Sequence, residues 1–327
     1  MKVQQSFCLS RSLKSLSIVL VVVDCFFTGA LAQADNIYVD LSRPGSADNS
    51  GTIDKLDSNG NGTQFASGLN FPAEMAFDGS GNLYVASWLR GTIVKVNSSG
   101  TSSAFASGLV SPNYLGLACD GAGNLFAALS GNTPGTGSIE KFSPNGNGSA
   151  FASGLGFPSA LAFDKGGNLF VALDVGNPSI IMEYKSGGGS SQFATVDGQK
   201  VTSLAVDNSG NVYAAMTAGT GNGNPPYYPA IEEFDSTGNG SILPSSGFSS
   251  AGLGGLALDS SGNLYVVDKG NNAIDKFTSS GSESVFATGL DNPQYIAIPV
   301  PEPATWAMVA LGMGVVLGSR RLRRRSS

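Results

Sequence analysis

The chain has 327 residues, of which 24 are acidic and 18 are basic, and it contains no histidine. Between Gln33 and Pro303 the 10 basic and 23 acidic residues leave a net charge of −13, and the basic residues are scattered. This balance argues against a surface for nucleic acid or anionic lipid. The absence of histidine excludes histidine zinc sites and serine triads in their usual forms.

The N-terminus has the features of a secretory signal peptide spanning residues 1–32. Three basic residues precede an apolar run from Leu16 to Phe27, and Ala30 and Ala32 place small side chains where a signal peptidase cleaves. A buried N-terminal helix is the alternative. Cleavage after Ala32 would remove two of the three cysteines, so that Cys119 could form no internal disulfide.

The segment from Asn36 to Ile298 repeats one pattern at intervals of 42 to 52 residues. That period is typical of propeller blades of about four strands. In the unit that follows residue 74 we expect strands at 75–78, 82–87, 92–97 and 103–107, joined by Gly, Asn and Pro. The pattern Asp-x-x-Gly-Asn begins at Asp78, Asp120, Asp164, Asp207 and Asp259, with a truncated copy, DNIYVD, at Asp35.

Each Asp-x-x-Gly-Asn segment is predicted to form a tight hairpin between the first and second strands of a blade. Asp can bond its own backbone, Gly supplies a positive φ, and Asn tolerates the left-handed region. A calcium loop built from Asp78 and Asn82 is the competing interpretation. Such a loop needs far more oxygen ligands than this stretch offers, so the turn is favoured.

The first strand of every unit has one small face and one bulky face. We expect the small face to meet the bulky face of the neighbouring blade near the axis, where blades crowd most. Cys119 stands at a bulky position and is therefore predicted to be a core residue. The small residue, two positions before the hairpin Asp or its equivalent, is Ala76, Ala118, Ala162, Ala205, Ala257 and Ala297.

The two ends of the repeat region are complementary. The region starts with a second strand, NIYVD, and stops after a first strand, 294–298. Pairing these strands would complete a sixth blade from both ends and close the ring, which an open solenoid would not require. We therefore predict an all-β, six-bladed β-propeller over residues 33–299, and we expect a monomer.

The units read A-x-D-x-x-G-N-L-[YF]-V with a later I-x-[KE]-[FYV], and they resemble NHL repeats and the six-bladed family of lactonases related to senescence marker protein. The resemblance covers Asn36 to Ile298 and implies a fold more than a chemistry, because such propellers host enzymes and binding platforms alike. Amidating-type propeller lyases hold zinc through histidines, and streptogramin lyases, which the pattern also resembles, use a catalytic histidine. Neither chemistry can operate here as known.

Alternating strand directions define two faces of the predicted ring. The hairpin face carries the Asp-x-x-Gly-Asn turns and the third-to-fourth connections, which barely vary in length. The variable face carries the remaining connections, and we expect function there. Aromatic and cationic side chains on it could hold a sugar or an apolar ligand, or could simply pack down the loops. The candidate ligand-binding residues are Trp88, Arg90, Tyr114, Tyr227 and Tyr228.

The lactonase resemblance implies a divalent ion, such as Ca²⁺, held by Glu, Asn and Asp near the channel mouth. The candidate ligands are Glu74, Asn113, Asp174 and Asp268. They do not match that family's ligand set residue by residue, and the equivalents of Glu74 are Gly116, Ala160, Ser203, Gly255 and Tyr295. We therefore predict no catalytic residue and no cofactor, with a metal-dependent lactonase as the alternative.

The C-terminus, residues 300–327, has three parts in order. Pro301, Glu302 and Pro303 precede an apolar segment, 304–318, whose 15 residues are short for a membrane helix unless flanking arginines snorkel. The tail, 319–327, should stay cytoplasmic and holds Arg320, Arg321, Arg323, Arg324 and Arg325. The order resembles the PEP-CTERM sorting signal of Gram-negative bacteria. That resemblance implies recognition of the Pro-Glu-Pro motif by an exosortase that removes the helix; a permanent membrane anchor is the alternative.

These features together predict an exported protein of the cell surface or exopolysaccharide, transiently held in the inner membrane. We expect a non-enzymatic binding or scaffold module whose partners are an exosortase-type enzyme and a surface glycan or protein, and not nucleic acid.

Overall fold

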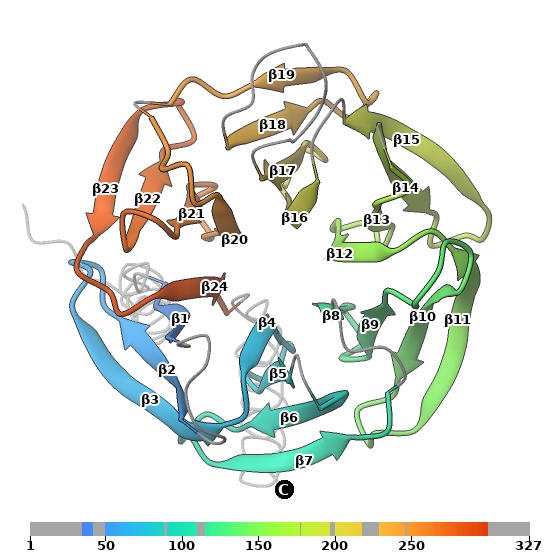
Figure 1. Ribbon diagram of the computed structural model, residues 1–327, viewed down its shortest axis with the longest axis horizontal. Coiled ribbons are helices and arrows are strands. Elements are labelled where there is room, and N and C mark those ends of the chain that lie inside the picture. The colour runs from blue at the N-terminus through green and yellow to red at the C-terminus, as the bar shows by residue number, and fades with distance from the viewer. Residues whose placement is uncertain are drawn as a thin grey trace, which may run out of the picture. The chain divides into compact units, whose positions relative to one another are not determined.

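The computed structural model describes residues 35–41, 50–87, 90–109, 115–176, 178–196, 200–217, 229–245 and 247–299. Within these ranges six four-stranded antiparallel sheets stand around one axis (Figure 1), which confirms the predicted six-bladed β-propeller. No helix in the same ranges is long and apolar enough to cross a membrane. The predicted signal segment, the apolar segment 304–318 and the arginine tail lie outside the described residues.

Every sheet runs from an innermost first strand to an outermost fourth strand, and we number the sheets as blades 1 to 6. From blade 1 to blade 6 the first strands are β24 (Pro293–Ala297), β4 (Pro72–Phe77), β8 (Leu115–Cys119), β12 (Pro158–Phe163), β16 (Val201–Val206) and β20 (Leu253–Leu258). The second strands are β1 (Ile37–Leu41), β5 (Leu83–Ser87), β9 (Leu125–Leu129), β13 (Leu169–Leu173), β17 (Val212–Met216) and β21 (Leu264–Asp268).

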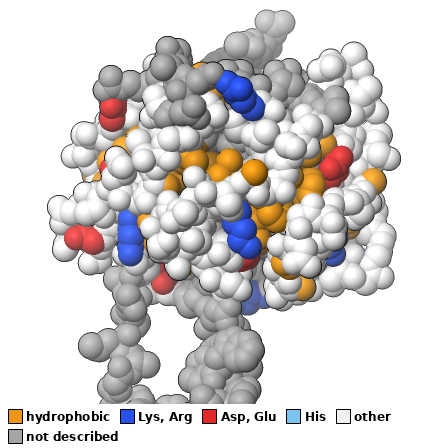
Figure 2. Space-filling model, turned by 90° about the horizontal axis from the view of Figure 1, so that it is seen from below, with side chains coloured by type: hydrophobic (Ala, Val, Ile, Leu, Met, Phe, Trp, Pro, Cys, Tyr) orange, Lys and Arg blue, Asp and Glu red, His pale blue; other side chains and the backbone are white. Residues whose placement is uncertain are grey.

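The outer half of each blade has the same regularity. The third strands are β2 (Gly51–Leu56), β6 (Thr92–Val96), β10 (Gly137–Phe142), β14 (Ser179–Tyr184), β18 (Ala230–Phe234) and β22 (Ala273–Phe277). The fourth strands are β3 (Gly62–Leu69), β7 (Ser102–Ala106), β11 (Gly148–Leu155), β15 (Ser190–Val196), β19 (Gly240–Ile242) and β23 (Glu283–Ala287). Figure 2 views the ring from its side, where apolar side chains form a band and charged side chains are scattered singly.

Blade 1 is assembled from both ends of the propeller sequence, as predicted. β24 pairs antiparallel with β1, so that Ala297 lies opposite Tyr38. The fully buried Asp40 adds a contact that the repeat pattern does not predict. Its Oδ1 accepts hydrogen bonds from the backbone N–H of Gln294 (3.2 Å) and of Tyr295 (2.6 Å). Charge-assisted bonds of this kind fix the closing strand at a point where the β1–β24 register shifts.

The innermost strands interlock as predicted, because each alanine shares a core cluster with a bulky residue of the next blade. Cys119 is partly buried and packs against the cluster of blades 2 and 3, also as predicted, and burial raises the pKa of its thiol. The alanine partners are Ala76 with Leu117, Ala118 with Leu161, Ala162 with Leu204, Ala205 with Leu256, Ala257 with Ile296, and Ala297 with Met75.

The Asp-x-x-Gly-Asn segments form the predicted hairpins, with Asp as the hub. Asp78 Oδ1 accepts from the N–H of Ser80 and of Asn82, both at 2.9 Å, and its Oδ2 accepts from the Asn82 side-chain amide at 2.8 Å. Only Gly81 adopts a positive φ in this turn, 76°. Asn82 does not use its tolerance of the left-handed region and acts as a side-chain donor instead. Tyr84 Oη also donates to Asp78, at 3.3 Å.

The third-to-fourth hairpins hold neighbouring blades together at the rim. Gly100, in the blade 2 hairpin, has a φ of 82° and packs so tightly on blade 1 that a Cβ there would overlap the carbonyl oxygen of Phe65. Phe65 is the extra residue of a bulge in β3, since its neighbours Gln64 and Ala66 pair with Asp54 and Ile53 of β2. The contact therefore depends on both the glycine and the bulge.

Candidate functional site

Near the innermost strands, on the variable face, side chains from blades 6, 1 and 2 come together. We call Asp40, Glu74, Lys269 and Tyr295 the axial cluster. Lys269 directly follows β21, and its Nζ lies 5.6 Å from the centre of the Tyr295 ring on β24. The lysine stem passes over the first strand of its own blade, because a Cβ at Gly254 would lie 3.0 Å from Lys269 Cε.

The electrostatics of the axial cluster favour a neutral Glu74. Burial of the Glu74 carboxyl raises its pKa well above the usual range; Lys269 opposes this shift and Asp40 adds to it. Burial lowers the pKa of Lys269, while Asp40 and Glu74 counteract that shift. The cluster thus combines an ammonium donor, a carboxyl group that binds a proton readily and an aromatic face, which together suit a polar ligand, while the buried Asp40 is engaged by the closing strand.

The other described metal candidates are engaged by residues outside the axial cluster. Asp268 is buried and closes a loop of blade 6: it accepts from Ser249 Oγ (2.5 Å) and N–H (3.1 Å) and from the Asn271 side-chain amide (2.8 Å). Asp174 forms an ion pair with Lys200, which lies at the start of blade 5, at 3.7 Å. Asn113 lies outside the described residues.

No set of three or more His, Cys, Asp or Glu side chains is placed to hold a metal ion within the described ranges. Of the predicted ligand-binding residues, Arg90 is exposed on the variable face at the turn between β5 and β6. Its backbone N–H donates to the carbonyl of Ser87 at 3.4 Å. The other predicted members of this set lie outside the described residues: Trp88, Tyr114, Tyr227 and Tyr228.

Two phenylalanines on the variable face have strained backbones that sequence reasoning missed. Phe71 and Phe157 directly precede the first strands of blades 2 and 4, with φ values of 40° and 38°. Blades 6 and 1 place Gly252 and Asn292 at the equivalent position, also with positive φ, as is usual for those residues. A bulky side chain there costs about 1–3 kcal/mol. Nothing in the sequence signals this conformation, because a residue before proline usually adopts an extended backbone.

The surroundings of Phe157 form a small amphipathic surface, which we call the Phe157 patch: Phe157, Asp174, Val175 and Lys200. The carbonyl of Phe157 accepts from the N–H of Asp174 at 3.1 Å. Val175, the next residue, is 51% exposed although it is apolar. Half-buried phenylalanine, exposed valine and an ion pair therefore lie along one edge of the variable face.

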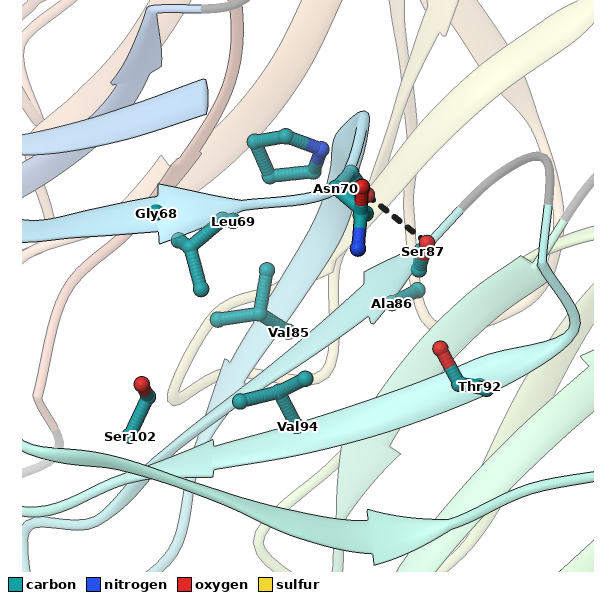
Figure 3. Close-up of a pocket in the computed structure, with 10 residues that line it drawn as sticks. Gly68, Leu69, Asn70, Val85, Ala86, Ser87, Thr92, Val94 and Ser102 are labelled. Atoms are coloured by element: carbon teal, nitrogen blue, oxygen red, sulfur yellow. Dashed lines mark hydrogen bonds between the residues drawn. The ribbon is translucent and has the colours of Figure 1, made fainter. Parts of the chain in front are cut away.

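A cleft between blades 1 and 2 is too small to be the site. It is lined by the end of β3, the start of β4 and parts of β5, β6 and β7, and Ser87 Oγ donates to the carbonyl of Asn70 at 2.7 Å beside it (Figure 3). Its volume of about 80 Å³ leaves room for a few water molecules and not for a sugar ring.

Comparisons with known proteins define the C-terminus and the fold. Residues 299–325 match the family model described as the PEP-CTERM protein-sorting motif. A search of curated proteins finds no match. Among solved structures, a nidogen/laminin complex is 16% identical over 83% of this chain and 100% of that chain, with a TM-score of 0.65.

Two further solved structures share the fold. TolB from Acinetobacter baumannii is 14% identical over 85% of this chain and 71% of its own, with a TM-score of 0.63. A gluconolactonase from Xanthomonas campestris is 16% identical over 66% of this chain and 75% of its own, with a TM-score of 0.53. Likeness at this level of identity shows the architecture and leaves the chemistry to the site.

The described residues thus define a six-bladed β-propeller, a ring closed by strands from both ends of its sequence. This propeller carries a PEP-CTERM sorting motif, which directs exosortase-dependent export and sorting to the cell envelope.

Proposed function

We propose that the protein is a non-enzymatic binding or scaffold module of the cell surface or exopolysaccharide. The observation that carries this proposal is the engagement of Asp174 and Asp268, two of the three described candidate metal ligands, within the protein. Asp174 pairs with Lys200, and Asp268 accepts several hydrogen bonds from its own blade. Glu74 lies within the field of Lys269. A divalent ion would have to displace these cations and donors before it could bind.

The side chains on the variable face indicate the class of ligand. Phe71 and Phe157 are retained at positions where Gly or Asn would relieve strain, and strain of this kind concentrates at functional sites. Aromatic faces stack on sugar rings, and adjacent charged groups bond to hydroxyls. Arg90 and the Phe157 patch supply both kinds of group, so a surface glycan is the ligand we propose, with a protein partner as the second possibility.

Retention on the exopolysaccharide of the producing cell tests the proposal. The exported protein should co-sediment with this polysaccharide in the presence of a chelator, and Phe157→Ala should weaken retention. Val285→Ser is the matched control, because Val285 is an apolar residue 62% exposed on β23 at the rim, away from the variable face. Loss of retention with chelator, or equal effects of the two substitutions, would contradict the proposal.

A divalent-metal-dependent lactonase is the second candidate. It is favoured by the likeness to a gluconolactonase structure and by the raised pKa of Glu74 beside the axis. This candidate requires an ion that Glu74 helps to hold despite Lys269, together with hydrolysis of a lactone or ester.

A further inference from the structure

The last strand of the propeller, which precedes the sorting motif in the sequence, ends at one face of the ring. β24 runs antiparallel to β1 and ends with Ala297 opposite Tyr38, at the start of β1. Asp35, just before that start, accepts a 2.6 Å hydrogen bond at Oδ2 from the N–H of Ser260 in the blade 6 hairpin. Both ends of the described propeller therefore lie on the hairpin face, and blade 1 stands between blades 6 and 2 (Figure 1).

The connection from this face to the sorting motif is very short. Ile298 is still buried in the core of blades 6 and 1, and the motif begins at Pro301. Four residue steps from Ala297 to Pro301 span at most about 14 Å, even when fully extended. Pro299 and Pro301 stiffen this connection further. Any enzyme that binds the motif must therefore approach within that distance of the innermost part of the hairpin face.

We propose that the hairpin face around the chain exit is the surface that meets the sorting enzyme, and that the variable face is directed away from the membrane. We call this surface the exit surface: the turns 78–82 of blade 2 and 259–263 of blade 6. Its partner is the extracytoplasmic side of the membrane enzyme that reads the Pro301–Pro303 motif. After processing, the same geometry would leave the variable face free for its ligand.

The chemistry of the exit surface suits close approach by a protein. The residues at the tips of its turns are Gly79, Ser80, Ser260 and Ser261, which are small and exposed. Their backbones are held rigidly by Asp78 and Asp259, so the surface needs no reordering on contact.

A lipid surface fits the exit surface less well. None of its four tip residues is apolar, so it has no side chain to insert into a bilayer. The two turns contain no Lys or Arg, and Asp78 is paired with Lys95 at 3.8 Å, so the turns themselves offer no cation to anionic headgroups. The membrane enzyme is therefore the partner that the surface favours.

Bulky substitutions in the full-length protein test the proposal in a host that carries an exosortase-type enzyme. The side chains of Ser80 and Ser261 are at the second turn position, where only the backbone N–H bonds to the hairpin Asp. Ser80→Trp combined with Ser261→Trp should slow loss of the C-terminal segment at least about threefold through steric clash. The matched control is Ser209→Trp, at the same turn position in blade 5, away from the exit.

A rescue experiment distinguishes a steric clash at the exit surface from a loss of folding. Inserting about twelve Gly and Ser residues between Pro299 and Val300 should restore processing of the double variant by distancing the ring from the enzyme. Protease resistance of the propeller should be unchanged in every variant. Equal slowing by Ser209→Trp, failure of the insertion to rescue, or unchanged processing in the double variant would overturn the proposal. So would binding of the purified protein to phosphatidylglycerol vesicles that Ser80→Trp abolishes, because lipid would then occupy the surface.

Discussion

Asp275 on β22 carries a charge that the folded protein accommodates poorly at neutral pH. The residue is 8% exposed, and no hydrogen bond or ion pair neutralises its carboxyl in the described part of the chain. Burial, followed by repulsion from Asp268 and Glu283, raises its pKa from 3.8 to about 6. Replacing Asp275 with the isosteric, uncharged Asn should therefore stabilise the protein above that pH.

The expected gain follows from the linkage between protonation and folding. A folded-state pKa above the unfolded value means that the neutral form is the one the fold tolerates, so stability is full below pH 3.8 and is lost as pH rises through about 6. A shift of this size corresponds to about 3 kcal/mol at most, and we expect about 1–3 kcal/mol at pH 8. Below pH 4 the Asn variant should show no such gain.

Urea denaturation of wild type and Asp275→Asn at pH 4 and pH 8 measures this difference. The matched control is Asp54→Asn: Asp54 pairs with Val39 in blade 1 as Asp275 pairs with Val266 in blade 6, and burial alone raises its pKa. Without acidic neighbours to add repulsion, its gain at pH 8 should be smaller. An equal gain from Asp275→Asn at both pH values, or no gain at pH 8, would show that the charge on Asp275 does not destabilise the fold.

Three further substitutions test the packing and the site. Gly100→Ala should destabilise the protein by more than Gly81→Ala in thermal unfolding. Both glycines have a positive φ, but only at Gly100 would the new Cβ press against a neighbouring blade. Equal losses of stability would show that this rim contact is dispensable. Asp40→Ala should expose the amide hydrogens of β24 to faster exchange with solvent and cost about 1–3 kcal/mol, since two partly buried N–H groups lose their acceptor. Unchanged exchange would show that Asp40 does not hold the closing strand. Phe157→Asn should raise the free energy of unfolding by about 1 kcal/mol, because it relieves strain, and should weaken glycan retention. A loss of both stability and retention would show that the Phe157 side chain is needed for packing.

The propeller could be predicted from the sequence because each repeat follows local rules that packing between blades does not override. The Asp hubs of the hairpins, the interlocking alanines and the pairing of β24 with β1 follow from turn chemistry, alternation and period. The axial cluster was less accessible. Glu74 stood out as the one carboxyl group among its equivalents, but the position of Lys269 depends on Gly254, whose missing side chain lets the lysine stem cross a first strand.

Most of the features that could not be predicted from the sequence depend on contacts between residues that are far apart along the chain. Asp40 occupies a position that is alanine or valine in the other blades, yet its amide partners lie 254 and 255 residues away. The strain at Phe71 and Phe157 depends on a backbone conformation that the Phe-Pro dipeptide does not specify. The engagement of Asp174 and Asp268 likewise required the positions of Lys200 and Ser249.

Thermal unfolding of the exported protein, first with chelator and then with Ca²⁺, Mg²⁺, Mn²⁺ or Zn²⁺, distinguishes a binding module from a metal-dependent enzyme. An ion bound to the folded state at about 100 times its dissociation constant would stabilise it by roughly 2.7 kcal/mol, a shift that the transition midpoint reports clearly. A binding module whose carboxylates are engaged internally should show no shift with any of these ions. A shift that Glu74→Gln abolishes would contradict this account and favour the metal-dependent lactonase.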